Sequence, residues 1–556
     1  MAVARGDQPA DVVIKGGRVL SVFTKEWLDV DVAICDGHVV GLGAYHGFRA
    51  IDVEGAYLVP GFIDAHMHLE SSKLMFDEFA RAVVPQGTTA VVADPHEIAN
   101  VLGTDGIHWL LDVSADLPVD VFVMASSCVP ASAFESPRRS MTVGDMESLL
   151  RRHRTLGIAE MMNYPGVIAG APSEVAKLTT GLTDHVDGHA PGVRGPALNA
   201  YLAAGIRSDH EATTPEEALE KRRLGMWVML REASIARNLV DLLPLVREHG
   251  PERCMFCTDD REPSFLVEEG HINQMVRVAV EEGVTPEDAI VMATLNPAGY
   301  HRLWRHGAIA PGYLADILVL DDLVGFRPRL VLKRGAEPAY PAIPVPEWVR
   351  QTVHVAQVTG DSFRIEGSRG PVRVIELVPT QLLTIEQAME PTLRDGQLVA
   401  DPARDLAKIA VIERHHASGR IGLGLVTNVG LARGAYASTV AHDAHNIVVV
   451  GVDDADMALC VSRLAEMGGG IVVAEAGQIV GELALPVAGL MSDRPLAEVH
   501  ERMVALEARL RQQGVRSEAP FMSLSFLALS VIPQLKITDQ GLVDVGRFEI
   551  VPLSIG

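Results

Sequence analysis

The 556-residue sequence has few cysteines for its length. There are five, an odd number, and a chain of this length with so few cysteines is not built on a secreted disulfide framework. A reducing compartment fits this usage, so we expect a cytoplasmic protein. Cys254 and Cys257 have a C-x-x-C spacing but lie in an apolar run, and no second pair accompanies them. This pattern favours packing in a hydrophobic core over metal binding or redox chemistry.

Positive charge and long apolar runs are also scarce. The 48 Lys and Arg residues stand against 72 Asp and Glu, a formal net charge of -24. Such a surface repels phosphate backbones, so we expect no nucleic-acid partner. The longest uncharged run, Ala519 to Leu535, contains serines and Pro533 and is shorter than the ~20 apolar residues of a membrane helix. We expect no membrane association, no secretory signal at the N-terminus, and a buried position for this run.

Length and hydrophobicity predict a folded protein of several domains. At 556 residues and 48% hydrophobic content, the chain exceeds what one core can organise. Residues 11–58 contain short strand patterns separated by turns, at 11–14, 18–20, 30–34 and 38–42, with a strong hairpin signal at Asp36-Gly37. A similar pattern returns at residues 307–336. We predict that residues 1–59 and 306–345 form one small, split, β-sandwich-like domain, with everything between them inserted.

The inserted residues, 60–305, alternate apolar runs with helical patterns. Thr214 followed by Pro215 predicts the start of one such helix, which continues to Leu224. Eight candidate strands lie at residues 60–68, 90–94, 121–126, 157–160, 187–189, 205–209, 226–230 and 254–258. Eight β-α units in roughly 250 residues predict an α/β fold, a (β/α)8 TIM barrel, whose active site lies at the carboxyl ends of the strands.

The sequence changes character near residue 345. A cluster of prolines predicts a linker there, comprising Pro338, Pro341, Pro344 and Pro346. The remaining residues mix strand patterns at 447–451 and 470–474 with a helical pattern at 496–512. We predict a separate C-terminal α+β domain over residues 346–556.

Polar residues that suit metal binding end most of the predicted barrel strands. His66 and His68 stand two apart, so both side chains point to the same face of a strand, although a bland surface pair explains these two equally well. The later strands end in further residues of the same kinds: His96, Glu160, His189, His210, Asp259 and Asp260. Convergence of all of them on one barrel mouth favours a metal site over coincidence. Imidazole and carboxylate together suit Zn²⁺, Mn²⁺ or Fe²⁺ better than Ca²⁺ or Mg²⁺.

Several segments resemble a known family. The segment Pro60-Gly-Phe-Ile-Asp-Ala-His-Met-His68 is similar to a motif of the metal-dependent amidohydrolase superfamily. The segments Ala93-Asp-Pro-His-Glu97 and Ala159-Glu-Met-Met-Asn163 are more specific and resemble the bacterial adenine deaminases within it. The resemblance extends over nearly the whole chain and implies hydrolytic deamination of adenine to hypoxanthine and ammonia, in purine salvage or catabolism. It also implies a purine substrate, and we expect a homo-oligomer, in the form of a dimer.

The resemblance implies a binuclear centre of divalent transition-metal ions, Mn²⁺ or Fe²⁺, with Zn²⁺ as an alternative. His66 and His68 would hold one ion, and His189 and His210 the other. Glu160 would bridge the two, where many superfamily members use a carbamylated lysine.

Two further residues receive catalytic roles from the resemblance. Asp259 would shuttle protons and also bind metal, although Asp260 beside it is the alternative on this strand. His96 is similar to a catalytic histidine of the family. Three more polar residues are candidates for substrate binding, with surface salt bridges as an equally good explanation: Glu211, Arg231 and Glu232. His442 and His445 lie within the region of resemblance without an assigned role, and a substrate-gating or interface loop and ordinary turn chemistry explain them equally well.

Two other functions remain open on the residues alone. A cyclic-amide hydrolase such as a dihydroorotase or hydantoinase would use the same fold, but those enzymes usually carry a lysine where Glu160 stands. A catalytically inactive binding protein would show the loss of a metal ligand, and each candidate ligand is present in the sequence.

Overall fold

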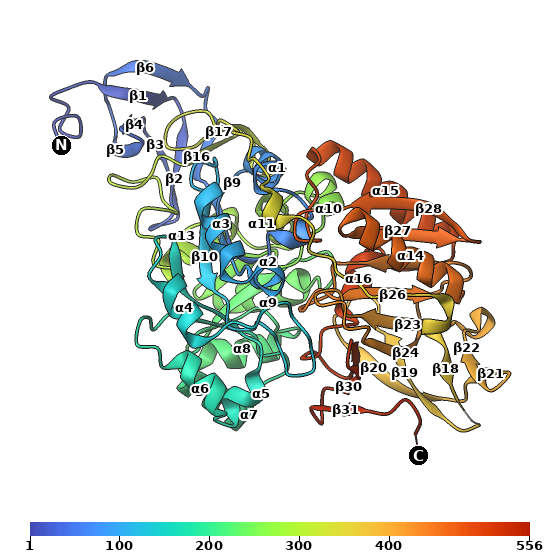
Figure 1. Ribbon diagram of the computed structural model, residues 1–556. Helices are drawn as coiled ribbons and strands as arrows, with labels where there is room; N and C mark the ends of the chain where they lie inside the picture. Colours follow the sequence, from blue (N-terminus) through green and yellow to red (C-terminus); the bar gives the residue numbers. More distant parts are fainter. Residues whose placement is uncertain (368, 556) are drawn as a thin grey trace.

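A computed structural model describes residues 1–367 and 369–555. The small N-terminal sheets lie at one end, a helix-covered α/β body forms the centre, and a mixed sheet with its helices forms the other side (Figure 1). No helix in the described ranges is both long and apolar enough to cross a membrane.

Two small sheets contain the N-terminal strands. One has the order β5-β4-β1-β6 and the other the order β17-β16-β7-β2-β3. Their strands are β1 (Ala10–Lys15), β2 (Arg18–Ser21), β3 (Glu26–Asp29), β4 (Val32–Cys35), β5 (His38–Leu42), β6 (Gly47–Asp52), β7 (Tyr57–Pro60), β16 (Ile317–Leu320) and β17 (Pro328–Leu332). The predicted hairpin is confirmed, because Asp36 and Gly37 both have positive φ and join the antiparallel pair β4 and β5. Ile317 of β16 pairs with Pro60 of β7, so the two distant segments share a sheet.

The central body contains eight parallel strands in chain order, and all eight predicted strands are present. They are β8 (Phe62–Met67), β9 (Thr88–Ala93), β10 (Asp120–Ala125), β11 (Thr155–Met161), β12 (Val186–Gly188), β13 (Ser208–Asp209), β14 (Trp227–Arg231) and β15 (Cys254–Cys257). They form a five-stranded sheet, β12-β11-β10-β9-β8, and a three-stranded sheet, β13-β14-β15. The sheets meet where Asp259 N donates to His66 O at 3.1 Å and where Arg207 N donates to Val186 O at 3.1 Å. This is a TIM-like α/β domain.

Helices connect the strands and cover the outside of this body (Figure 1). They include α1 (Phe76–Val83), α2 (His96–Leu102), α3 (Thr104–Val113), α4 (Val143–Leu150), α5 (Tyr164–Ile168), α6 (Pro172–Leu178), α7 (Gly195–Ala203), α8 (Pro215–Arg223), α9 (Leu239–His249), α10 (Pro263–Glu268), α11 (Ile272–Glu281), α12 (Pro286–Ala293) and α13 (Leu295–Tyr300). The helix predicted at Thr214 is confirmed as α8, because the Thr214 hydroxyl accepts from the amide of Glu217. Cys254 and Cys257 are free and buried in β15, as expected for core residues.

The apolar run around Pro60 is divided between two sheets, which the sequence pattern did not predict. Pro60 ends β7 in the N-terminal sheet, and Phe62 begins β8 in the central body. Gly61 lies at the crossing, where an added Cβ would come within 2.1 Å of the Thr89 hydroxyl oxygen. The absence of a side chain therefore allows the chain to pass from one sheet to the other at close range.

An eight-stranded mixed sheet dominates the C-terminal side, with the order β20-β19-β24-β23-β26-β25-β27-β28. Its strands are β19 (Val372–Leu377), β20 (Thr384–Met389), β23 (Leu406–Ile412), β24 (Ile421–Thr427), β25 (Ala435–Ser438), β26 (Ile447–Gly451), β27 (Gly470–Glu475) and β28 (Gln478–Ala484). The helices are α14 (Asp454–Met467), α15 (Leu496–Gln512) and α16 (Pro520–Phe526). Smaller strands are β18 (Ile365–Glu366), β21 (Thr392–Arg394), β22 (Gln397–Val399), β29 (Leu535–Thr538), β30 (Gly541–Asp544) and β31 (Glu549–Val551). The predictions for β26, β27 and α15 are confirmed, and the uncharged run from Ala519 is buried as expected.

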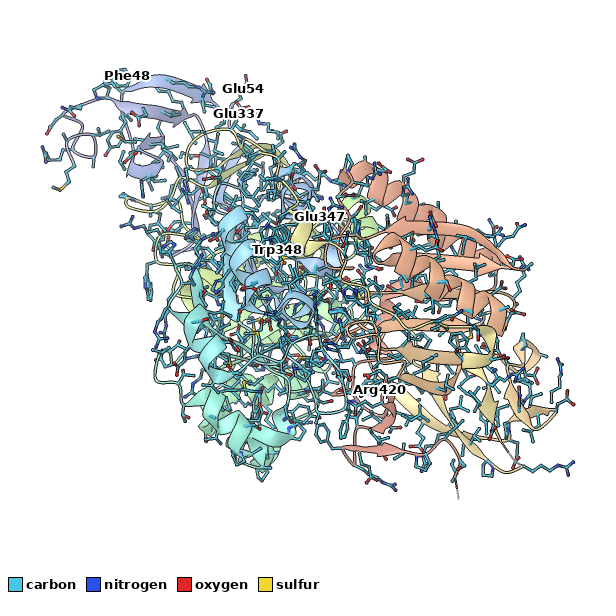
Figure 2. The ribbon with its side chains drawn as sticks, in the orientation of Figure 1. Phe48, Glu54, Glu337, Glu347, Trp348 and Arg420 are labelled. Atoms are coloured by element: carbon cyan, nitrogen blue, oxygen red, sulfur yellow. The ribbon has the colours of Figure 1, made fainter. Side chains whose placement is uncertain are left out.

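The C-terminal side packs against the carboxyl ends of the central strands. Figure 2 shows Trp348 and Glu347 in the connecting segment, and Arg420 at the boundary between the two halves. Arg420 Nη1 donates to the hydroxyl of Ser136 at 2.7 Å and to Asp539 at 3.1 Å. An apolar cluster also crosses this boundary and includes Met162, Leu382 and Phe526. The strand ends are therefore covered rather than open to solvent.

Candidate metal and catalytic site

The predicted ligands gather at the carboxyl ends of the central strands. His66 lies in β8, and Glu160 lies in β11. The others follow their strands directly or within two residues: His68 after β8, His189 after β12, His210 after β13 and Asp259 after β15. Each of these side chains is buried. The structure thus brings together residues that are spread over almost two hundred positions of the chain.

Glu160 lies between two pairs of histidines. Its Oε1 is 3.6 Å from His66 Nε2 and 3.4 Å from His68 Nε2. Its Oε2 is 2.8 Å from His189 Nδ1 and 3.3 Å from His210 Nε2. One carboxylate oxygen therefore faces each pair, which is the arrangement a bridging ligand requires.

Surrounding hydrogen bonds fix the orientation of these side chains. His68 Nδ1 lies 2.9 Å from the carbonyl oxygen of Asp94, which directs Nε2 toward Glu160. Asp64 accepts from the amide of Thr258 at 3.1 Å and so ties the end of β8 to the end of β15. Ligand rings held in this way lose little freedom when they bind an ion.

The donor set fits divalent transition-metal ions. Two groups of three have their donor atoms within 4.8 Å of one another and share the Glu160 carboxylate: His66, His68 and Glu160, and Glu160, His189 and His210. His66 Nε2 is buried and finds no hydrogen-bond partner among the described residues, and an ion would satisfy a buried nitrogen of this kind. Burial alone would raise the pKa of Glu160, but His210, His189 and His66 hold it well below its usual value. Glu160 is therefore an anion.

Replacing His66 with alanine is expected to lower the metal content, because it removes one nitrogen of the first pair. Elemental analysis of the purified, metal-loaded variant checks this. His306→Ala is the matched control. This partly buried histidine lies far from the cluster, and its Nε2 is 2.9 Å from Asp120 Oδ2. Full metal content in His66→Ala would remove His66 from the ligand set.

Asp259 and Asp260 face different partners. Asp259 Oδ1 is 3.1 Å from His68 Nε2, and its Oδ2 accepts from Arg231 Nη1 at 3.0 Å. Asp260 accepts from the Ser71 hydroxyl and lies 3.7 Å from His442 Nε2. Asp259 is therefore directed at the predicted ligands and held there by Arg231, whereas Asp260 lies near His68 and Asp259 but contacts Ser71 and His442.

The structure places the three candidate substrate-binding residues in two different environments. Arg231 and Glu211 form a buried ion pair, 1% and 4% exposed, in which Arg231 Nη2 donates to Glu211 Oε2 at 3.1 Å. The surface salt bridge considered for these two is wrong, because both lie inside the protein. Glu232 turns away from the cluster and accepts from Arg237 Nε at 2.7 Å.

His96 begins α2 and extends the cluster toward the C-terminal side. Its Nδ1 is 3.1 Å from Asp94 Oδ2, and its Nε2 is 3.5 Å from Asp443 Oδ1. Both carboxylate oxygens of Asp443 are buried and lack a hydrogen-bond partner within the part of the chain that the structure describes. Asp94 and Asp443 together raise the pKa of His96 well above its usual value against the effect of burial.

The C-terminal side supplies residues that sequence reasoning missed. A small cavity of about 20 Å³ is enclosed by the ligand cluster on one side and by Leu382, His442, Asp443, Phe526 and Leu529 on the other. His442 stacks on Phe526 with ring centroids 4.4 Å apart, while His445 lies 3.8 Å from Glu97. The His442-Asp-Ala-His445 spacing was the one available signal, and it did not reveal that Asp443 faces the cavity. Nothing in the sequence around the apolar residues of this cavity indicated that they lie at the site.

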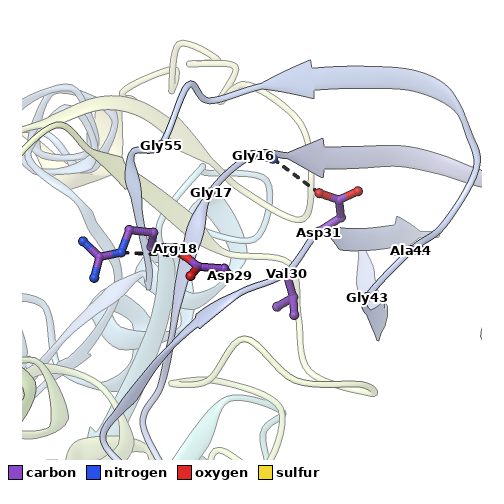
Figure 3. A pocket seen from close by; sticks show the side chains of 9 residues that line it. All are labelled: Gly16, Gly17, Arg18, Asp29, Val30, Asp31, Gly43, Ala44 and Gly55. Carbon is purple, nitrogen blue, oxygen red and sulfur yellow. Dashed lines mark hydrogen bonds and ion pairs between the residues drawn. The ribbon is translucent and has the colours of Figure 1, made fainter.

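A larger cavity lies elsewhere and lacks this chemistry. It measures about 500 Å³ and is lined by the glycine-rich turns of the N-terminal sheets. Figure 3 shows Arg18 facing Asp29, and the Gly16 amide facing Asp31, in this open recess. It contains no histidine and no convergent carboxylates, so it is not the candidate site.

Comparison with known proteins covers both halves of the site. Residues 57–358 match a family model described as the amidohydrolase family, and residues 381–549 match one described as the adenine deaminase C-terminal domain. "Adenine deaminase 2" from Carboxydothermus hydrogenoformans is 46% identical over 561 residues, which cover 100% of this chain and 98% of that protein. An "Adenine deaminase" from Cereibacter sphaeroides is 49% identical over 556 residues, covering 99% of this chain and 98% of that protein. The matched ranges include both the metal-ligand cluster and the residues that cover it.

Proposed function

Because the chain belongs to the adenine deaminases of the amidohydrolase family, we propose that it hydrolyses adenine to hypoxanthine and ammonia in purine salvage or catabolism. The observation that carries the proposal is the position of Glu160, with one oxygen toward His66 and His68 and the other toward His189 and His210. A carboxylate between two pairs of imidazoles is suited to bridge the two ions of a hydrolytic centre.

The cofactor of this proposal is a pair of divalent transition-metal ions. His66 and His68 would hold one, His189 and His210 would hold the other, and Glu160 would bind both. Mn²⁺ or Fe²⁺ suits this mixture of nitrogen and oxygen donors, with Zn²⁺ as the alternative. When bound, such an ion lowers the pKa of its water from ~15.7 to ~7 and so supplies a nucleophile at neutral pH.

Asp259 is the proposed proton carrier. Its Oδ1 faces the ligand cluster, and Arg231 holds its Oδ2 at 3.0 Å, so the carboxylate is oriented toward the reacting water. It takes a proton from the water that attacks C6 of adenine and delivers it to the leaving amine, after which the C6–N bond breaks and ammonia departs. General acid-base catalysis of this kind contributes roughly 10²–10⁴-fold.

His96 and Glu211 are proposed to support this reaction. Asp94 holds the His96 ring at 3.1 Å, and the charged imidazole stabilises negative charge on the nucleophile or the substrate ring. Glu211 borders the cavity and neutralises Arg231, so we assign it to substrate positioning. Glu232, which contacts Arg237 instead, would act on substrate only through the surrounding backbone.

Other assignments fit less well. In a dihydroorotase or hydantoinase we expect a lysine where Glu160 stands. An inactive relative would have lost a ligand, and every proposed ligand is present and buried. We also propose the domain division 1–59 with 306–345, 60–305 as a closed (β/α)8 barrel, and 346–556, together with a homodimeric, cytoplasmic state.

The test is release of ammonia by metal-reconstituted protein. The metal-free protein should gain adenine deaminase activity on addition of Mn²⁺ or Fe²⁺ alone, because Glu160 already supplies the bridging charge. Adenine should be preferred over hydantoin and dihydroorotate, and bicarbonate should not be needed. A strict bicarbonate requirement would show that a carbamylated lysine is the bridge, and turnover of the cyclic amides alone would overturn the proposed reaction.

A further inference from the structure

Two cavities lie on either side of Leu382. The inner one, about 20 Å³, borders the metal ligands and has room for a water molecule or an ion but not for a purine. The outer one, about 240 Å³, is lined by Leu382 together with Gln381 and Leu383 from the same loop. The two cavities share Leu382 on the C-terminal side and Glu211 on the side of the central strands. Leu382 therefore forms a wall between them.

Leu382 belongs to a loop that is hydrogen-bonded to the rest of the protein at two points. Residues 378–383 connect β19 to β20. At the tip, Ala236 N donates to Thr380 O at 3.0 Å, and at the base Thr384 N donates to Pro533 O at 3.0 Å. Leu382 lies between these two attachments, so its own position depends on what holds its backbone.

Lys536 holds that backbone. Its Nζ donates to Leu382 O at 2.7 Å and to Phe526 O at 3.0 Å. Both of these residues line the inner cavity, and they come from different segments of the C-terminal side. One side chain thus links the two apolar walls of the site.

The lysine is unusual in its surroundings. It is 0% exposed, and within the described ranges its side-chain hydrogen bonds go to two backbone carbonyls and no carboxylate pairs with it. Burial alone lowers its pKa to about 7. A methionine would fill the same space without this desolvation cost, so what the lysine adds is its pair of hydrogen bonds.

We propose that the purine reaches the metal-ligand cluster from the outer cavity past Leu382, and that Lys536 is the positioning residue that holds Leu382 and Phe526 in the closed arrangement. This inference rests on the proposed deamination of adenine. Glu211 and Arg231 line the outer cavity, so the base meets polar groups before it passes the leucine. Movement of the loop admits the base, and the return of Leu382 to its place on Lys536 excludes water during the reaction.

Lys536→Met in the full-length, metal-loaded protein tests whether Lys536 holds Leu382 and Phe526 in place. Amides of the 378–384 segment should exchange hydrogen faster than in the wild type, and kcat/KM for adenine should fall about tenfold because the walls are misplaced. Metal content should stay unchanged. Lys408→Met is the control, since Lys408 is also buried and donates to a phenylalanine carbonyl, Phe363 O at 2.9 Å, away from the site, and it differs from Lys536 in that it also pairs with Asp454 at 2.8 Å. If hydrogen exchange in Lys536→Met is unchanged, or if both variants accelerate it equally, Lys536 does not hold the loop in place.

Leu382→Trp tests the passage. The larger side chain should block it and lower kcat/KM at least about tenfold, whereas Ile385→Trp, at an exposed residue that lines neither of the two cavities, should change it little. If Leu382→Trp has a lower metal content or a lower Tm than the wild type, Leu382→Phe is used in its place. Wild-type kcat/KM in a folded Leu382 variant would overturn the route. The exchange experiment needs no substrate, so its result stands even if the wild type does not deaminate adenine.

Discussion

Glu160→Gln is expected to lose most of its bound metal and nearly all of its activity. The amide keeps the shape of the side chain but removes the negative charge that lies between His66, His68, His189 and His210. An amide also offers one oxygen in place of two, so only one histidine pair would face a good ligand. Elemental analysis after dialysis, together with ammonia release, measures both losses.

Two further variants make this result specific to the bridge. Glu174→Gln changes another buried glutamate, one that pairs with Lys177 at 2.9 Å, and should retain both metal and activity. Glu160→Asp keeps the charge but shortens the side chain, and should retain about one ion of the two. If Glu160→Gln holds two ions as firmly as the wild type, Glu160 is not the bridging ligand.

The predicted metal cluster could be read from the sequence because of a property of parallel barrels. All strands point their carboxyl ends to one mouth, so a polar residue at the end of an apolar run is placed near every other such residue. His66, Glu160 and Asp259 meet for this reason, although they are far apart in the chain. No contact between them had to be predicted individually.

The residues of the C-terminal side that cover the site could not be predicted from the sequence in the same way. Asp443 and Leu382 approach the cluster because an entire sheet packs against the mouth, and that packing leaves no pattern in the local sequence. Strand β6 was missed for a related reason, since nearly all of its residues are exposed and show no apolar alternation. The turn at Asp36-Gly37, by contrast, was found because its positive φ angles are a local requirement.

The choice between Asp259 and Asp260 has a geometric basis in the structure. Asp259 has positive φ and directs Oδ1 to His68 at 3.1 Å. Asp260 also has an oxygen within 4.8 Å of donor atoms of His68 and Asp259, but its contacts are to the Ser71 hydroxyl and the His442 ring, and no arginine of the described ranges holds it. Burial would raise the pKa of Asp259, but His66, His68 and Arg231 hold it well below its usual value, so it is ionised and able to accept a proton.

Asp259→Asn should therefore reduce kcat by ~10²–10⁴-fold, the usual cost of removing a general acid-base group. The asparagine oxygen can still accept from Arg231, so the side chain should stay in place, and the variant should keep most of its metal. In the wild type, kcat should fall at low pH as the carboxylate is protonated, and Asp259→Asn should lose or shift that limb. A merely ligating Asp259 would instead give metal loss that excess Mn²⁺ partly restores. Asp260→Asn is the matched control and should be mild; if it is inactive while Asp259→Asn turns over normally, Asp260 carries the proton.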